Sequence, residues 1–194
     1  MVGDDAGVGE VGGGGMQALI RKCDDREVST ILEVINDAAD AYRGVIPVDR
    51  WKEPYMPENK LRDEINDGVV FWGYYRGGEL VGVMGTQHVL DVTLIRHAYV
   101  RSLRRRKGIG SQLLVYLLSE SLRPYLIGTW AAATWAIRFY EKHGFRLLSC
   151  EETKNVLNKY WSVPKRQIET SVVLANEKWR YQEASRDETT ATEF

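Results

Sequence analysis

Cysteine and histidine are scarce in this 194-residue sequence, which has two of the first and three of the second. Cys23 and Cys150 show neither metal-ligand spacing nor the pattern of a disulfide framework, so no metal is expected. Neither cysteine has a recognisable base partner in the sequence, which gives a catalytic cysteine little support. A chain with so few cysteines fits a reducing compartment, and we expect a cytoplasmic location.

Long apolar runs and an excess of charge of either sign are also missing. No stretch approaches the roughly 20 consecutive apolar residues of a membrane-spanning helix, and the N-terminus lacks a charged-then-apolar signal pattern. The 26 Lys and Arg residues nearly balance the 27 Asp and Glu residues. This balance argues against a protein that coats nucleic acid, so we expect neither a nucleic acid nor a membrane as partner.

Length and composition predict one globular domain between two tails. A hydrophobic content of 44% is enough for a sizeable core at this length. Residues 1–15 are rich in glycine and should form a disordered tail, residues 16–182 a single domain, and residues 183–194 a flexible polar tail. Both Met1 and Met16 are candidates for the natural start.

Apolar periodicity and turn residues divide the domain into strands and helices. Strands are expected at residues 17–23, 69–75, 80–86, 92–100, 125–130, 146–150 and 171–175. Helices are expected between a cap at Asp24 or Asp25 and Pro47, and at about 58–66, 108–121, 131–144 and 155–160. The paired glycines of residues 76–79 suit a hairpin turn. The strand, helix and strand over residues 92–130 form a β-α-β unit, which normally places two strands in parallel with a ligand crevice at their C-terminal ends.

The most informative segment is residues 104–111, RRRKGIGS, which joins an apolar strand ending at Val100 to an apolar helix. Glycine has no Cβ, so Gly108 and Gly110 allow a ligand to approach the unpaired amides of the first helical turn. Such a helix start binds phosphates, and the preceding cations strengthen the local positive potential. The segment therefore predicts a site for a ligand with several phosphate charges.

Two familiar phosphate-binding motifs do not fit this spacing. A Walker loop would place Lys directly after the second glycine, where this sequence has Ser111. The dinucleotide motif G-x-G-x-x-G needs a third glycine, and Leu113 stands there instead. A nucleoside-triphosphate hydrolase and a dinucleotide-binding fold are both weakly supported.

A second segment, which lies downstream, narrows the class of ligand that the loop is expected to bind. Residues 136–145 are AIRFYEKHGF, and the apolar positions around them recur at helical spacing up to Gly144. Arg105-x-x-Gly108-x-Gly110 resembles the R/Q-x-x-G-x-G/A signature of the GNAT acyl-CoA-dependent N-acetyltransferases, and the downstream segment resembles their A-x-x-F/L-Y-x-K-x-G-F signature. From Ile20 to about Val173 the sequence thus resembles the GNAT superfamily. Within that superfamily it is similar to an uncharacterised type of bacterial or archaeal member.

The resemblance implies an α/β fold of GNAT type, with a central mixed β-sheet of six to seven strands flanked by helices and with splayed central parallel strands. It also implies acetyl-CoA as acyl donor. In the family, loop amides hold the pyrophosphate and exposed strand backbone pairs with pantetheine. Carried over, the cofactor-binding residues are Tyr99, Val100, Arg101, Arg105, Arg106, Lys107, Gly108, Ile109, Gly110, Ser111, Ala133, Ala136 and Tyr140. Many relatives have Asn at the position of Ala133, so one side-chain contact is lost here.

Acetyl transfer to an amine needs a donor that protonates the departing thiolate. By resemblance, Tyr140 lies beside the sulfur, and a phenol stays protonated at neutral pH, where it can act as general acid. The alternative is a tyrosine that only packs on a helix face. Within the two signatures, we favour the catalytic role.

The general base is less well defined by the sequence. His97 lies in an apolar strand close to Val100, and imidazole titrates in the useful range. An ordinary hydrogen-bonded core histidine is at least as well supported. Arg96 could orient a carboxylate of the acceptor or pair with a buried acid. Three weaker candidates for the base are His88, Asp91 and Glu33, and some members of the family use a chain of waters without a dedicated residue.

Four aromatic residues are concentrated in the region that builds the acceptor pocket in similar enzymes: Tyr42, Trp51, Tyr55 and Trp72. Aromatic faces can hold a cationic amine or a flat substrate, although core packing explains such residues equally well. The expected partner is an amine-bearing small molecule or a peptide, and the family resemblance leaves a homodimer open.

Three functions follow from these observations. The first is an N-acetyltransferase that transfers an acetyl group from acetyl-CoA to a primary amine by direct attack in a ternary complex. The second is a non-catalytic acyl-CoA-binding module with a regulatory or sensing role. The third, nucleic-acid binding through Arg101 and residues 104–107, is disfavoured by the overall charge.

Overall fold

The computed structural model describes residues 9–11, 18–162 and 164–179. The predicted C-terminal tail and most of the predicted N-terminal tail lie outside the described residues, except that Gly9–Val11 form strand β1. The chain divides into two compact units, residues 1–87 with 96–121 and residues 88–95 with 122–194. A single domain over residues 16–182 stays a prediction.

The first unit holds most of an antiparallel sheet. Three of its strands are β1, β2 (Ala18–Lys22) and β3 (Val70–Arg76). Two further strands, β4 (Glu79–Val89) and β5 (Val92–Val100), are shared between the units: β4 belongs to the first unit up to residue 87, and β5 belongs to it from residue 96. Strands β1 to β4 pair antiparallel in this order, and β5 follows β4. Gly77 and Gly78 have φ angles of +58° and +80°, as a tight hairpin turn requires. The predicted hairpin is confirmed.

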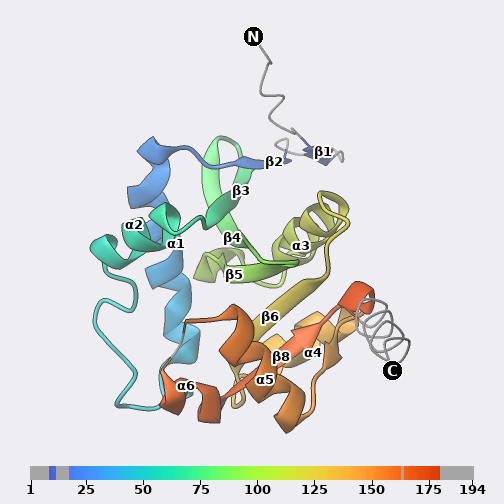
Figure 1. Cartoon of the computed structure of the whole chain (residues 1–194). Helices are drawn as coiled ribbons and strands as arrows, with labels where there is room; N and C mark the ends of the chain where they lie inside the picture. The colour runs from blue at the N-terminus through green and yellow to red at the C-terminus, as the bar shows by residue number, and fades with distance from the viewer. Residues whose placement is uncertain (1–8, 12–17, 163, 180–194) are drawn as a thin grey trace. The chain divides into compact units, whose positions relative to one another are not determined.

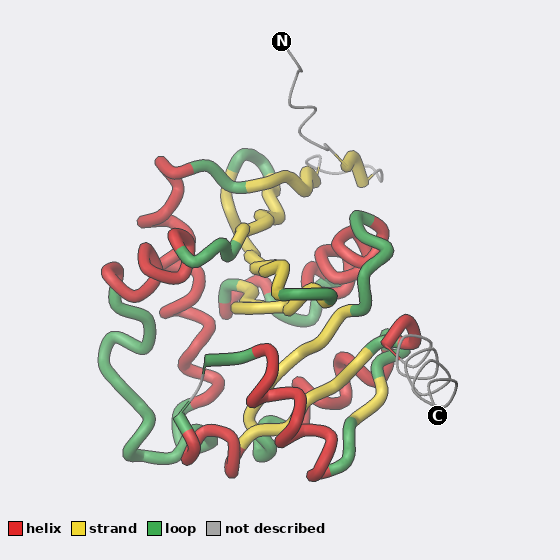
Figure 2. Tube along the Cα trace, in the orientation of Figure 1, coloured by secondary structure: helices red, strands yellow, loops and turns green. Residues whose placement is uncertain are grey.

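Three longer helices belong to the first unit: α1 (Val28–Ala39), α2 (Glu58–Asn66) and α3 (Ile109–Ser119). Asp24 and Glu27 form a capping box over the short 3-10 helix Asp25–Glu27 that leads into α1. A second short 3-10 helix, Asp40–Tyr42, ends α1. The long loop that follows, residues 43–57, connects α1 to α2 (Figure 2).

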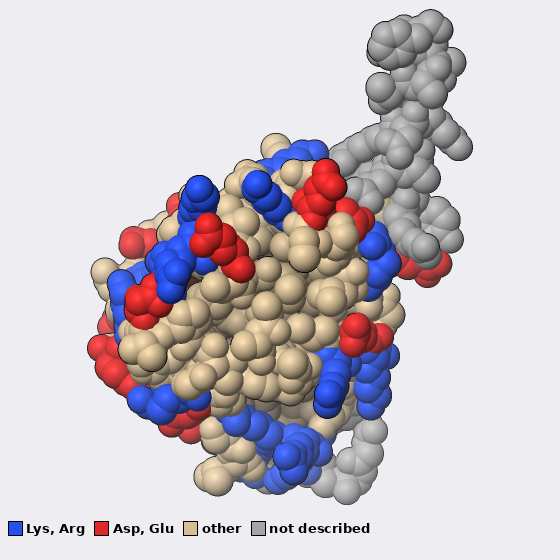
Figure 3. All heavy atoms as spheres, turned by 90° about the horizontal axis from the view of Figure 1, so that it is seen from below, with Lys and Arg blue, Asp and Glu red and all other residues tan. Residues whose placement is uncertain are grey.

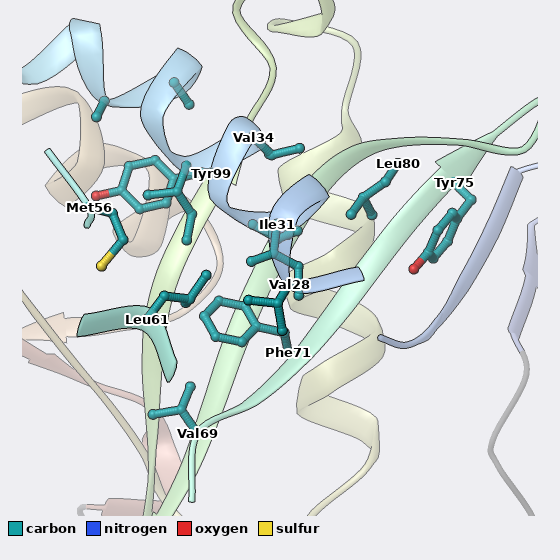
Figure 4. Close-up of a cluster of buried hydrophobic side chains, with 14 residues drawn as sticks. Val28, Ile31, Val34, Met56, Leu61, Val69, Phe71, Tyr75, Leu80 and Tyr99 are labelled. Atoms are coloured by element: carbon teal, nitrogen blue, oxygen red, sulfur yellow. The ribbon is translucent and has the colours of Figure 1, made fainter. Parts of the chain in front are cut away.

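The core of the first unit lies between α1, α2 and one face of the strands (Figure 4). The buried side chains of α1 recur every three or four residues and form one apolar stripe on the helix. On β3, Phe71 and Tyr75 point into this core. The intervening Trp72 and Tyr74 contact α3 instead, through Tyr116 and Gln112. Strand alternation therefore places α1 and α2 on one face and α3 on the other (Figure 1).

The second unit contains a smaller sheet with a parallel pair. Residues 92–95 of β5 lie beside β6 (Tyr125–Trp130), followed by β8 (Ser171–Ala175) and β7 (Arg146–Leu147). Strands β5 and β6 pair in parallel over Thr93–Ile95 and Tyr125–Ile127 only, although β5 continues to Val100 and β6 to Trp130. Strand β8 is antiparallel to both β6 and β7.

Helices α4 (Thr134–Lys142), α5 (Cys150–Tyr160) and α6 (Lys165–Thr170) complete the second unit. The predicted strand at 146–150 is wrong beyond Leu147, and the helix predicted at 155–160 begins five residues earlier. The cause is a capping box, in which Ser149 accepts from the Glu152 amide and Glu152 accepts from the Ser149 amide. Helix α6 was not predicted.

The fold is of the mixed α/β class that the sequence predicted. The sheet order is β1-β2-β3-β4-β5-β6-β8-β7, which comprises seven strands and the three-residue β1. Within the described part of the chain, no helix has the length and apolar character that a membrane crossing requires.

Candidate functional site

The glycine loop ends in the predicted helix start. Gly108 is the N-cap of α3 and has a φ angle of +76°, in the region that favours glycine. The first helical hydrogen bond runs from the Gln112 amide to the Gly108 carbonyl, 3.0 Å. The amides of residues 109–111 precede that bond in the first turn, where backbone donors lack partners within the helix. The loop thus offers the backbone donors that an anion needs.

A glycine that the sequence analysis did not single out fixes the position of this helix start. A Cβ at Gly82 in β4 would lie 2.9 Å from Cγ2 of Ile109, the first residue of α3. Ile109 is buried, with 3% exposure. The bare Gly82 backbone therefore lets α3 begin directly on the sheet.

Replacing Gly82 with alanine is expected to push Ile109 away and to lower the free energy of unfolding by about 1–2 kcal/mol. Chemical denaturation measures this loss. Gly128→Ala in β6 is the matched control, because its Cβ would meet Trp161 at an ordinary 3.5 Å. Equal stability of Gly82→Ala and wild-type protein would show that Gly82 does not set the position of α3.

Three of the basic residues around the loop are bound within the protein. Arg101 contacts Glu33 at 3.2 Å, and Arg104 contacts Glu79 at 3.2 Å. Arg105 donates from Nη2 to the Ala38 carbonyl, 2.6 Å, at the C-terminal end of α1. These side chains hold the loop against α1 and β4, so Arg105 acts mainly on the loop's position.

Arg106 and Lys107 are different. Both are exposed, and within the described part of the chain neither has an ion pair or a side-chain hydrogen bond. Arg106 has a φ angle of +60°, so the backbone turns sharply here. These two cations, followed by the amides of α3, form the part of the loop that is available to a phosphate.

The backbone of Arg101 is also engaged. Its amide donates to the Val81 carbonyl, 2.9 Å, and its carbonyl accepts from the Arg104 amide, 2.8 Å. Because both backbone groups of Arg101 have partners, pairing of the strand with pantetheine is expected at Tyr99 and Val100.

In the second unit, Tyr140 lies on α4 and is 5% exposed. Its ring makes edge contacts with Phe139, at 4.9 Å between centroids, and with Phe145, at 5.8 Å. Ala133 is the N-cap residue of α4 and Ala136 is in its first turn, and both are buried. The sequence correctly placed all three at one helix, which ends before Gly144 at a φ angle of +82°.

His97 lies in the first unit and forms a pair with an acid that the sequence analysis missed. Its Nε2 is hydrogen-bonded to the Glu64 carboxylate on α2. Its ring lies between Phe71, at 5.8 Å, and Tyr99, at 6.4 Å. Glu64 is 33 residues away in the sequence and sits on a polar helix, so no local pattern pointed to it.

The other candidates for a base are engaged elsewhere. Glu33 pairs with Arg101, and Asp91 accepts from the Tyr160 hydroxyl at 2.9 Å. His88 Nδ1 lies 3.0 Å from the Thr93 hydroxyl, and burial together with the Arg123 charge lowers the pKa of His88. Arg96 was expected either to orient a carboxylate of the acceptor or to pair with a buried acid. The structure shows the pairing, since Arg96 Nη2 lies 3.4 Å from the Glu64 carboxylate.

The predicted aromatic pocket divides into two places. Tyr42, Trp51 and Tyr55 pack against the core of the first unit, and Tyr99 joins them by donating its hydroxyl to that of Tyr55, 3.1 Å. Trp72 lies on the opposite face of β3 against Tyr116, 5.5 Å between centroids, and is not part of this group. Trp72 follows Phe71 directly on β3, so strand alternation turns it away from the core that the other three contact.

Asn36 on α1 holds the loop that carries Trp51 and Tyr55. Its amide accepts from the Met56 amide at 2.8 Å and donates to the Met56 carbonyl at 3.0 Å. Met56 is 1% exposed (Figure 4). A two-point hydrogen bond to buried backbone thus orders the loop that carries these aromatic residues.

Cys23 is not a reactive nucleophile. Its thiol accepts from the Tyr75 hydroxyl at 3.5 Å, and burial raises the pKa of Cys23 to about 11.

Among the described residues, no group of three His, Cys, Asp or Glu side chains is placed to hold a metal ion. On the face in Figure 3, basic and acidic side chains lie next to one another around the periphery of a broad area that has neither.

Comparison with known proteins identifies a family match for the central part of the chain. Residues 67–147 match the acetyltransferase (GNAT) domain, and this segment contains both sequence motifs. A curated relative, the UPF0157 protein YqkA of Bacillus subtilis, is 28% identical over 126 residues. That match covers 63% of this chain and 36% of YqkA, so the chain spans little more than a third of that protein's length.

Solved structures share the fold. The PaiA N-acetyltransferase of Thermoplasma acidophilum, in complex with coenzyme A, has a TM-score of 0.61 at 18% identity, over 83% of this chain and 99% of that one. The ribosomal-protein-S18-alanine N-acetyltransferase of Escherichia coli has a TM-score of 0.59 at 16% identity, over 82% and 92% of the two chains.

Proposed function

We propose that this chain transfers an acetyl group from acetyl-CoA to a primary amine of a small molecule or peptide, since residues 67–147 match the acetyltransferase (GNAT) domain. The observation that supports this most strongly is the start of α3. There Gly108 at a φ angle of +76°, the exposed Arg106 and Lys107, and the first-turn amides would together bind a phosphate.

The residues present fit the coenzyme. Arg106, Lys107 and the amides of residues 108–111 would hold the pyrophosphate, and the Tyr99 and Val100 backbone would pair with pantetheine. Ala133 and Ala136 lie at the start of α4, about two turns and one turn before Tyr140. Bound acetyl-CoA supplies the acyl group as an activated thioester.

Two side chains of this protein are proposed to transfer protons, one as acceptor and one as donor. His97 takes a proton from the amine nitrogen, which leaves a lone pair free for attack on the acyl carbon. Tyr140 gives its hydroxyl proton to the departing sulfur as the C–N bond forms and the C–S bond breaks. Both steps take place in one complex of enzyme, donor and acceptor.

The two unpaired cations should contribute more to coenzyme binding than their bound neighbours. The double variant Arg106→Ala, Lys107→Ala is expected to raise the Kd for acetyl-CoA about tenfold and to weaken its salt dependence, because two phosphate contacts are lost. Calorimetry at two salt concentrations measures both effects. Arg104→Ala, which removes a side chain paired with Glu79, is the control and should bind nearly as wild type. Equal losses in both variants would contradict the assignment.

Release of free thiol from acetyl-CoA tests the proposed function. The assay compares small amines, polyamines, amino acids and peptides as acceptors, with acetyl-CoA alone as the blank. We expect at least one acceptor class to accelerate release in proportion to enzyme concentration. Acetyl-CoA binding without turnover on any acceptor would instead favour the non-catalytic acyl-CoA-binding module.

A further inference from the structure

The pair formed by Glu64 and His97 has the geometry of an oriented base. The two side chains come from α2 and β5, and they are 14% and 12% exposed. Glu64 also lies 3.4 Å from Arg96 Nη2 and 3.8 Å from Lys60 Nζ. A carboxylate that is shielded from water and shared by three donors holds each of them in a narrow range of positions.

The charge state of Glu64 fixes the tautomer of His97. Burial raises the pKa of the Glu64 carboxyl, but the hydrogen bond from His97 and the neighbouring cations outweigh it and leave the pKa below its usual range. An ionised carboxylate only accepts hydrogen bonds, so Nε2 of His97 carries the proton. Burial, together with the charges of Arg96 and Lys60, lowers the pKa of His97 more than the hydrogen bond and charge of Glu64 raise it. A neutral imidazole with its lone pair on Nδ1 results.

Nδ1 is the nitrogen that the protein leaves open. Within the described residues it has no hydrogen-bond partner. The His97 side chain as a whole is 12% exposed, so the ring is not fully enclosed by the protein. The lone pair can therefore meet a proton from outside the core.

The backbone at His97 supports a functional role. Its φ angle is +50° within a strand, a conformation that costs a non-glycine residue about 1 kcal/mol or more. The contacts with Glu64, Phe71 and Tyr99 hold the ring in place despite this cost. Such strain is most often kept where it aims a side chain.

We propose that Glu64 is the positioning residue of a Glu64–His97 pair in which Nδ1 of His97 receives the proton of the acceptor amine. This inference rests on the proposed function and adds a residue to it. In the step, the N–H bond of the acceptor breaks, its electron pair stays on the acceptor nitrogen, and the proton moves to Nδ1. Glu64 remains a carboxylate and stabilises the imidazolium that forms.

The titratable groups that face the pair come from each element around it. They are Glu64 and Lys60 on α2, Arg96 and Tyr99 on β5, and Tyr55 on the loop before α2. Of these, only the Glu64 carboxylate favours the protonated form of His97 through both a hydrogen bond and its charge. Removing the Glu64 charge should therefore lower the pKa of His97.

Glu64→Gln tests the inference because it keeps the size of the side chain and removes the charge. Imidazolium loses its stabilising partner, so the pKa of His97 falls and the acidic limb of the kcat profile moves to lower pH. We expect kcat to fall about 10- to 100-fold, with the KM for acetyl-CoA changed less than about twofold. Glu64→Asp keeps the charge and should recover part of the rate.

Nuclear magnetic resonance measures the pKa of His97 directly, because the chain has only three histidines and His97→Gln identifies the resonance. Glu58→Gln on the exposed face of the same helix is the control and should change neither pKa nor rate. An unchanged His97 pKa in folded Glu64→Gln overturns the inference, as does full activity of that variant. Absence of amine-dependent thiol release by wild-type protein would instead remove the proposed function itself.

Discussion

Gly110→Trp is expected to weaken acetyl-CoA binding by at least about 100-fold, or about 2.7 kcal/mol. Gly110 is the second residue of α3, so a large side chain there covers the first-turn amides that should receive the pyrophosphate. Gly110 is a better position than Gly108, because only Gly108 has a positive φ angle that any side chain would strain. Calorimetric titration with acetyl-CoA measures the loss.

Ser119→Trp is the matched control for this variant. Ser119 is the exposed last residue of the same helix, so the same side chain is added far along α3 from the loop. The control should bind acetyl-CoA with the wild-type Kd, and both variants should keep the wild-type circular dichroism spectrum. Wild-type affinity of folded Gly110→Trp would exclude this helix start as the phosphate site.

Tyr140→Phe should lower kcat about 100-fold while the Kd for acetyl-CoA changes less than about threefold. Phenylalanine keeps the edge contacts with Phe139 and Phe145, so only the hydroxyl is removed. A group that gives its proton as the sulfur departs acts in the transition state and contributes little to binding of the ground state. Steady-state kinetics and calorimetry separate the two effects.

The control for Tyr140→Phe is a second buried tyrosine of the same unit. Tyr160 donates its hydroxyl to Asp91, so Tyr160→Phe should lower thermal stability and leave kcat unchanged. If Tyr140→Phe also changes only stability, Tyr140 is a packing residue and the general acid lies elsewhere.

Much of the fold could be predicted because local signals and tertiary contacts agree. The glycine pair at 77 and 78 determines a hairpin by its backbone preference alone. The apolar stripe of α1 predicts both a helix and the face that it buries. The apolar pattern of residues 145–148 does not show where β7 ends; the signal for it is the S-x-x-E capping box of Ser149 and Glu152, which starts α5.

The candidate site was only partly predictable, for a physical reason. Backbone features such as the glycine loop depend on consecutive residues, so the sequence located this loop correctly. Side-chain partners depend on the tertiary fold. The sequence could not show that Arg105 would bind the end of α1, that Trp72 would face α3, or that Glu64 would reach His97.

Product analysis by mass spectrometry tests the central claim most directly, because it compares the amount of acetylated amine with the amount of free thiol in one reaction. We expect equal amounts of both with wild-type protein, and at most about 2% of these amounts with Gly110→Trp at acetyl-CoA concentrations near the wild-type Kd. Thiol release without acetylated amine, or turnover by Gly110→Trp equal to wild type, would contradict the central claim.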